Sequence, residues 1–211
     1  MKLAVIRHGD SHHSAQGIIA GPRTCPGLTS HGIAQSQLLA DRLRRSGELS
    51  DCSIVLVSPV ARAIQTAEAL SGVLPAATFI EDRRLIEIDP GNVDGMTYDD
   101  YRRHYGIFDP ASHPDRWFAP DGETWNEFRA RIRSLLSDLA CRYDDQTIVA
   151  VAHAGTIVAI LLELFGIPRP GTGARFEPVH TSITTWRHND AWILESYNDA
   201  LHLRAGAFSR G

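Results

Sequence analysis

The chain has 211 residues, of which 43% are hydrophobic and 22% charged, and its formal net charge is −4 at pH 7. This composition predicts one globular domain over residues 1–211 with a sizeable core. The negative charge, without a stripe of Lys and Arg, argues against nucleic acid as a partner. Three cysteines, an odd number without zinc spacing, indicate reduced thiols. Because the chain enters its first strand without a signal-like segment, we expect a cytoplasmic protein.

The first third of the chain predicts two strands, a long loop and two helices. Residues 3–6 and 54–57 are short apolar runs typical of buried strands, and residues 10–27 are rich in Gly, Pro and Ser, as in a loop. Thr29 is a suitable N-cap for the first helix, and Pro59 suits the first turn of the second. The apolar positions expected on the inner face of the first helix are Ile33, Leu38, Leu39 and Leu43.

The rest of the chain continues this alternation. We expect a short strand near residues 78–80, helices over 97–105 and 123–143, and a hairpin formed by 182–187 and 192–197. Residues 147–165 are almost wholly apolar but are interrupted by His153-Ala154-Gly155, so they predict a strand and a buried helix that ends at Gly166 rather than a membrane span. The alternation favours an α/β fold, a three-layer α/β/α sandwich with a mostly parallel central sheet.

Cationic and imidazole side chains follow three of the predicted strands. Arg7 and His8 come after the first strand, Arg62 comes one turn into the helix after the second, and His153 ends the apolar run that starts at residue 147. Ligands of open α/β sheets bind outside the carboxyl ends of the strands. The sequence therefore predicts an anion site with a nucleophile at this edge.

Several segments together resemble the histidine phosphatase superfamily, the phosphoglycerate-mutase-like enzymes. They occur in the family's order and span nearly the whole chain. They are Arg7-His8-Gly9-Asp10-Ser11, Leu28-Thr29-Ser30-His31-Gly32, residues 58–67, Leu85-Ile86-Glu87 with Gly91 and Gly95, Gly122-Glu123-Thr124, and His153-Ala154-Gly155.

The resemblance implies a phosphomonoester hydrolase with a phosphohistidine intermediate. His8 is the expected nucleophile, because neutral imidazole can attack phosphorus and split one difficult step into two. A backbone carbonyl is implied to hold its tautomer. Glu87 is the expected general acid, with Asp89 in reserve. His153 is expected to donate a hydrogen bond to a phosphate oxygen.

Arginine forks are expected to hold the phosphate. Arg7 and Arg62 can each bind two oxygens, which lysine does less well. Ser11 and Ser14, in the loop after the nucleophile, and Thr181, in a late segment bordering the pocket, are further candidates for phosphate or substrate contact. We expect no cofactor and no metal. The expected partner is a small phosphorylated metabolite, and a homodimer is a candidate assembly.

Two features favour hydrolysis over phosphoryl shuttling. Ser14 and Ile18 stand where the mutases carry an asparagine and an arginine, and the acid-bearing loop resembles that of the phosphatases. A phosphoglycerate-type mutase and a catalytically silent domain that binds a phosphorylated ligand stay open as alternatives. Substrate choice is assigned to the loops 10–27 and 105–120, the second of which carries Trp117 and Phe118.

A cluster of histidines raises one more alternative, a metallohydrolase. It would use His8, His12, His13 and His31, but neighbouring side chains at 12 and 13 point apart on an extended loop, and metal sites acting on phosphate usually recruit carboxylates too. The role of His180, which stands where the family often has an asparagine, is left open.

Overall fold

The computed structural model describes residues 1–168 and 174–205 and has the predicted alternation of strands and helices. The strands are β1 (Lys2–Arg7), β2 (Cys52–Val57), β3 (Thr78–Glu81), β4 (Thr147–Ala152), β5 (Ile183–His188) and β6 (Trp192–Asp199). The helices are α1 (His12–Gln16), α2 (Ser30–Ser46), α3 (Ala61–Ser71), α4 (Tyr98–Tyr105), α5 (Trp125–Arg142), α6 (Ala154–Leu164) and α7 (Leu201–Ala205). Two single 3-10 turns are η1 (Arg83–Leu85) and η2 (Gly91–Val93).

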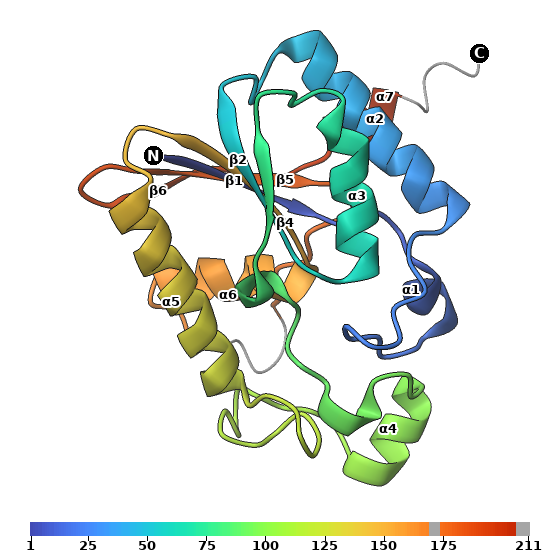
Figure 1. Cartoon of the computed structure of the whole chain (residues 1–211). Helices are drawn as coiled ribbons and strands as arrows, with labels where there is room; N and C mark the ends of the chain where they lie inside the picture. The colour runs from blue at the N-terminus through green and yellow to red at the C-terminus, as the bar shows by residue number, and fades with distance from the viewer. Residues whose placement is uncertain (169–173, 206–211) are drawn as a thin grey trace.

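The strands form one sheet in the order β3-β2-β4-β1-β5-β6 (Figure 1). The strands β1 to β4 run parallel to one another, and β5 pairs antiparallel with β1 and with β6. In the centre, Arg7 is in register with Ala152. The residues that follow β1 and β4 therefore leave the sheet side by side, which places His8 next to His153.

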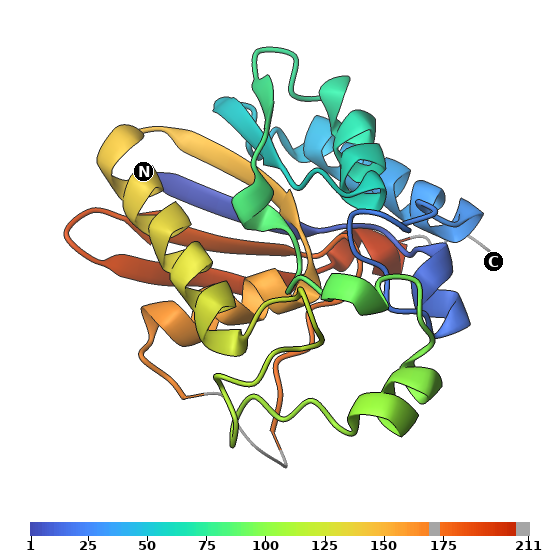
Figure 2. The ribbon, with the colours of Figure 1, turned by 60° about the horizontal axis from the view of Figure 1, so that its bottom comes forward.

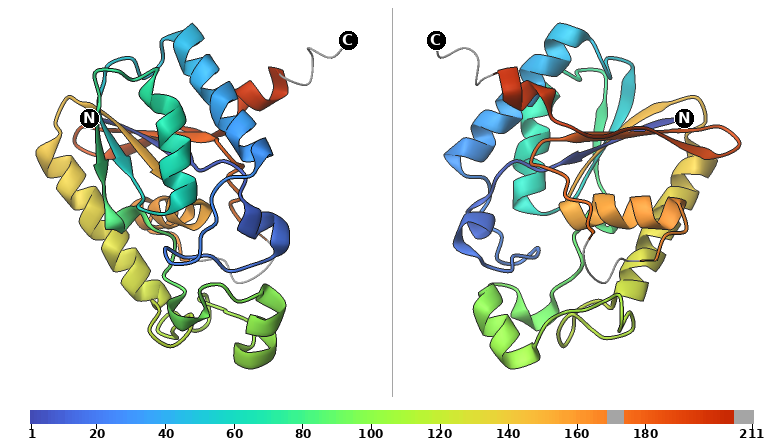
Figure 3. Two further views of the ribbon diagram at one scale, coloured as in Figure 1. Left: turned by 45° about the vertical axis from the view of Figure 1, so that its right-hand side comes forward. Right: turned by 180° about the vertical axis from the view of Figure 1, so that it is seen from behind.

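Helices cover both faces of the sheet, which confirms the predicted three-layer sandwich (Figure 3). On one face, α2 and α3 pack through Leu39 and Leu70 against Val55 and Val149. On the other face, α5 and α6 pack around Phe128 and Ile157 against side chains that include Leu3 and Trp186. The core is thus two apolar layers separated by the sheet, and almost all side chains of β1 and β4 are buried in it.

The predicted N-cap of α2 is confirmed, but the prediction that Ile33 of this helix faces the core is wrong. The hydroxyl of Thr29 accepts a hydrogen bond from the Gly32 N–H at 3.0 Å. Ile33, expected on the inner face, is 47% exposed. The reason is Gly32, which sits so close to the preceding loop that a Cβ atom there would collide with the carbonyl oxygen of Asp10. This close approach turns the next residue outward.

Two short helices were not predicted. The helix α1 lies within the segment expected to be a loop, and none of its five residues is buried, so it has no apolar period that a sequence could reveal. The helix α7 follows β6 and packs against α2. Figure 2 shows α1, α4 and the segment after α4 gathered at one end of the sheet. Within the described ranges no helix is both long and apolar enough to cross a membrane.

Candidate active site

His8 leaves β1 with its side chain fixed in one tautomer. Its ring is 3% exposed, and Nδ1 lies 2.7 Å from the carbonyl oxygen of Gly9. Because a carbonyl only accepts, Nδ1 carries the proton and Nε2 has the lone pair, which accepts a hydrogen bond from Arg62 Nε at 3.0 Å. Burial, and then the charge of Arg62, hold the pKa of His8 well below its usual range. The ring is therefore neutral, with Nε2 as its nucleophilic atom.

The two predicted arginines each donate to a backbone carbonyl. Arg7 donates from NH1 to Pro178 O at 2.6 Å and from NH2 to His180 Nε2 at 2.8 Å. Arg62, which is 2% exposed, donates from NH1 to Ala20 O at 2.9 Å. These contacts fix both planar groups beside His8 before any ligand binds, which is the preorganisation that phosphate binding needs.

His153 is the residue that precedes α6, directly after β4. It is 1% exposed, and its ring centroid lies 5.1 Å from that of His8. Its Nε2 is 2.8 Å from Ser58 Oγ, and its buried Nδ1 has no hydrogen-bond partner among the described residues. Burial and then Arg62 hold the pKa of His153 well below its usual range. A second neutral imidazole thus stands beside the first.

Glu87 faces the N-terminus of α6. Its Oε2 accepts a hydrogen bond from Gly155 N at 2.8 Å and its Oε1 accepts one from Ile88 N at 3.0 Å. An added Cβ at Gly155 would lie 2.7 Å from the carboxyl carbon of Glu87, so only glycine allows this approach. The reserve candidate Asp89 accepts a hydrogen bond from Gly91 N at 2.9 Å instead, and it does not line the pocket described below.

The three hydroxyl candidates occupy different places. Ser14 lines the pocket, whereas Ser11 and Thr181 do not, and contact of these hydroxyls with phosphate stays a prediction. Ser11 is fully buried with Oγ 2.8 Å from His13 Nδ1. Thr181 has a left-handed backbone (φ 57°), and its hydroxyl donates to the His180 carbonyl at 2.7 Å. Both hydroxyls are therefore engaged in holding neighbouring groups.

Two further histidines, His13 and His180, lie near His8. The ring centroids of His13 and His180 lie 6.2 Å and 5.7 Å from that of His8. Burial, followed by the charge of Arg62, lowers the pKa of His13 to about 3, and burial, followed by Arg7, lowers that of His180 to about 4. The sequence singled out both residues but could not place them next to each other, because α1 and the segment before β5 meet only in the folded chain.

The four histidines of the metallohydrolase alternative do not converge on one point, because only His8 and His13 line the pocket. His12 is exposed and His31 lies beside Gln35, away from the pocket lining. Within residues 1–168 and 174–205, no group of three or more His, Cys, Asp or Glu side chains is arranged to hold a metal ion. The cysteines Cys25, Cys52 and Cys141 are free thiols.

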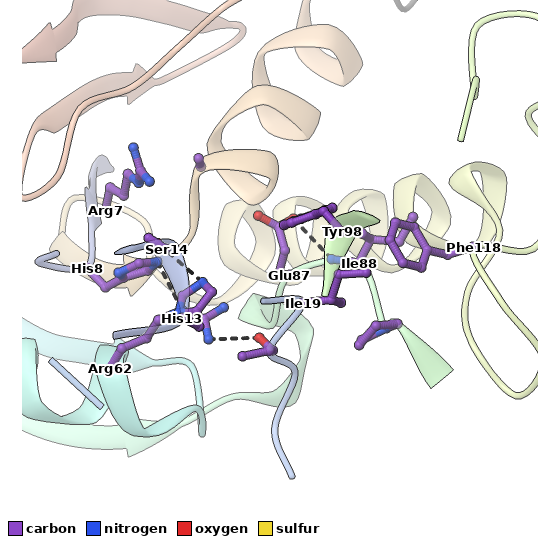
Figure 4. Close-up of a pocket in the computed structure, with 13 residues that line it drawn as sticks. Arg7, His8, His13, Ser14, Ile19, Arg62, Glu87, Ile88, Tyr98 and Phe118 are labelled. Atoms are coloured by element: carbon purple, nitrogen blue, oxygen red, sulfur yellow. Dashed lines mark hydrogen bonds between the residues drawn. The ribbon is translucent and has the colours of Figure 1, made fainter. Parts of the chain in front are cut away.

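A pocket of about 240 Å³ with two unlike ends is lined by His8, Arg62 and Glu87 together with the residues named below (Figure 4). One end gathers the guanidinium and imidazole groups, and the other is apolar, with Glu87 between them. The lining residues are Arg7, His8, His13, Ser14, Ile19, Ala20, Arg62, Glu87, Ile88, Pro90, Tyr98, Phe118 and Ala154.

A family model described as the histidine phosphatase superfamily (branch 1) matches residues 3–200. The chain belongs to this superfamily. It is 32% identical over 172 residues to a Hydrogenobacter thermophilus protein named "Putative phosphoserine phosphatase 2", with 79% of each chain covered. It is 24% identical to "Phosphoglycerate mutase-like protein 4" of Arabidopsis thaliana, over 98% of this chain and 89% of that one.

Solved structures of other proteins have the same fold. A phosphoserine phosphatase mutant from Entamoeba histolytica, in complex with phosphoserine, superposes with a TM-score of 0.77 at 26% identity and covers 96% of this chain and 98% of its own. YhfR of Bacillus stearothermophilus gives a TM-score of 0.80 at 23% identity, with the same coverage. The family resemblance found in the sequence is thus confirmed, and with it the assignment as a phosphatase.

Proposed function

We propose that the protein hydrolyses small phosphomonoesters through a phosphohistidine formed at Nε2 of His8. The observation that carries this proposal is the neutral, buried His8, whose proton is held at Nδ1 by Gly9 while Nε2 accepts a hydrogen bond from the guanidinium of Arg62. An imidazole so placed can attack an anion that the guanidiniums hold. The names of the relatives, among them phosphoserine phosphatases, support the same reaction class.

In the first step, Nε2 of His8 bonds to phosphorus and the bond from phosphorus to the alcohol oxygen breaks. The leaving oxygen takes a proton from the carboxylic acid form of Glu87. The phosphorylated ring keeps its Nδ1 proton, and the Gly9 carbonyl stabilises the positive charge that the ring acquires. The alcohol then leaves.

In the second step, the Glu87 carboxylate accepts a proton from water, whose oxygen attacks phosphorus. The nitrogen–phosphorus bond breaks, and its electron pair returns to Nε2. Inorganic phosphate, neutral His8 and protonated Glu87 result, so the cycle closes. Arg7, Arg62 and His153 stabilise the charge on the phosphoryl oxygens throughout, and one such donor typically contributes about 10²–10³ in rate.

A mutase would differ only in the acceptor, which would be a second substrate hydroxyl in place of water. The likeness to a phosphoglycerate mutase of Brucella canis, 28% identical over 173 residues, keeps this reaction as the second candidate. Hydrolysis is favoured because Ser14 and Ile18 occupy the positions of the expected mutase anchors. A single domain over residues 1–211, a homodimer and a cytoplasmic location stay predictions from the sequence.

The test is phosphate release from a panel of phosphomonoesters, followed by trapping with a ³²P-labelled substrate. We expect acid-labile label on the wild-type chain and none on His8→Ala, whose turnover should be abolished. His12→Ala is the matched control, because His12 is an exposed neighbour outside the pocket, and it should keep wild-type turnover. Wild-type-like turnover by His8→Ala would refute the proposal, and label transfer to a second hydroxyl would identify a mutase.

A further inference from the structure

The pocket changes character on either side of Glu87. Toward His8 it is lined by cationic and imidazole side chains, whereas beyond Glu87 it is bounded by Ile88, Tyr98 and Phe118 (Figure 4), with Ile19 close by. We call Ile19, Ile88, Tyr98 and Phe118 the apolar wall. If phosphorus sits at His8 and the leaving oxygen at Glu87, the rest of the alcohol extends toward this wall.

The apolar wall is built before any substrate arrives. Ile19 and Phe118 are only 5% and 9% exposed, because they belong to a small core of their own with Val93 and Tyr101. The chain around Ile19 is also fixed by backbone hydrogen bonds from Ile19 N to Met96 O and from Gly95 N to Ile19 O, each 2.8 Å. A preformed apolar surface recognises an apolar group without an ordering cost.

Among residues 1–168 and 174–205, the pocket lining contains no Lys or Arg besides Arg7 and Arg62, which stand at the phosphate end. The nearby Arg23 contacts Asp94 at 3.6 Å and donates to a backbone carbonyl, and Arg102, one turn along α4 from Tyr98, is paired with Asp99 at 3.5 Å. A carboxylate on the alcohol would therefore lose its water at this end with no lysine or arginine of the described lining to replace it.

The volume limits the size of the alcohol. The whole pocket is about 240 Å³, below the roughly 300–1,000 Å³ of sites for drug-sized ligands. After the phosphoryl group is seated, the remaining space suits a group of about one ring. Trp117, the neighbour of Phe118 in the chain, is 61% exposed and does not line the pocket, so Phe118 alone of this pair contributes to the wall.

We infer that the alcohol part of the substrate is small, uncharged and apolar, of about the size of one ring, and that the apolar wall selects it. This inference rests on the proposed phosphatase function and narrows its substrate class. It separates this chain from relatives named for phosphoserine, whose alcohol carries charged groups. Burial of one ring against such a surface should favour it by roughly 10- to 100-fold in kcat/KM.

The experiment compares esters that share a primary alkyl leaving group, so that chemistry is matched and only recognition differs. Benzyl phosphate, ethyl phosphate, O-phosphoserine and 3-phosphoglycerate are assayed for kcat/KM. We expect benzyl phosphate to exceed both charged esters at least ~10-fold, with ethyl phosphate in between. In Tyr98→Arg the preference for benzyl phosphate over 3-phosphoglycerate should fall ~10-fold or more, because a cation now faces the carboxylate.

Ile107→Arg is the matched control, since Ile107 is 75% exposed and lies outside the pocket; it should leave the preference unchanged. Equal or better hydrolysis of either charged ester by the wild type would overturn the inference and leave the phosphatase function standing. An unchanged preference in Tyr98→Arg would also overturn it. If no ester is hydrolysed, the proposed function fails, and calorimetric binding of the same four esters decides the preference.

Discussion

Gly155→Ala should displace the carboxyl group of the general acid, Glu87, while the other groups of the site stay in place. The added Cβ would lie 2.7 Å from the carboxyl carbon of Glu87, and closer still to Oε1, whereas ordinary contacts begin at 3.4 Å. The carboxyl group must therefore shift by at least 0.7 Å, and it loses its present hydrogen-bond geometry with the 155 N–H. A misplacement of about 1 Å at a reacting group can cost ~10²-fold in rate.

The fold should tolerate this change. Gly155 is the second residue of α6, and replacing a helical glycine by alanine stabilises a helix by roughly 0.5–1 kcal/mol. The atom that must move is the end of a flexible side chain, not backbone. We therefore expect a thermal midpoint equal to or above that of the wild type, together with a ~10²-fold lower kcat on alkyl phosphates.

The assay compares an alkyl phosphate with p-nitrophenyl phosphate, whose leaving group needs little protonation. The loss in Gly155→Ala should be large for the alkyl ester and small for the aryl ester. Gly72→Ala is the matched control: Gly72 ends α3 with φ −74°, and a Cβ there meets nothing within 4 Å. Wild-type alkyl turnover in Gly155→Ala would refute the assignment of Glu87 as the acid.

Three other perturbations test separate parts of the site. Arg62→Lys keeps the charge, but the lysine cannot donate both to His8 Nε2 and to the Ala20 carbonyl, so turnover should fall by about 10²–10³-fold. Full activity in steady-state assays would mean that Arg62 only attracts the substrate by its charge. Glu87→Gln should lower turnover of alkyl phosphates far more than of aryl phosphates, and equal losses would assign Glu87 a role in shaping its loop only. Burial, followed by the charge of Arg42, lowers the pKa of His202 to about 4, while the charges of Asp199 and Glu48 oppose this shift. The His202 ring is therefore neutral in the folded chain but gains a proton near pH 6.5 in the unfolded chain. Denaturant titrations should show stability falling as the pH drops from about 6.5 to 4, by at most ~1.4 kcal/mol per pH unit from this group, which is the limit for one titrating proton. An undiminished slope in His202→Gln would contradict this origin.

Much of the fold follows from local pattern. The strands β1, β2 and β4 are continuous apolar runs because both of their faces are buried, and Thr29 marks the start of α2 because its hydroxyl accepts a helix N–H. Local pattern fails where tertiary contacts decide. Ile33 turns outward because Gly32 packs against Asp10, and α1 carries no buried side chain that could create a period.

Some residues of the candidate site could likewise be placed from the sequence, whereas others could not. Arg7, His8, Arg62 and His153 could be placed from the sequence because each ends or follows a strand or lies in the first turn of a helix. The sheet order brings those ends together. His13 could not, since its entry into the pocket depends on how α1 docks. The hydroxyl of Thr181 could not be oriented either, because the left-handed backbone at that residue turns it toward His202, 2.8 Å away.

The central place of β1 also determines when the chain can fold. Its two neighbours come late: the partner of Lys2 in β4 is Thr147, 145 residues further on, and its partner in β5 is Arg187. At about 5–20 residues per second, a ribosome takes roughly 7 to 30 seconds to make the first of them. For that time residues 3–6 form an apolar strand without a partner, a segment prone to aggregate. The yield of active protein from cells should therefore depend on chaperones that shield the emerging chain.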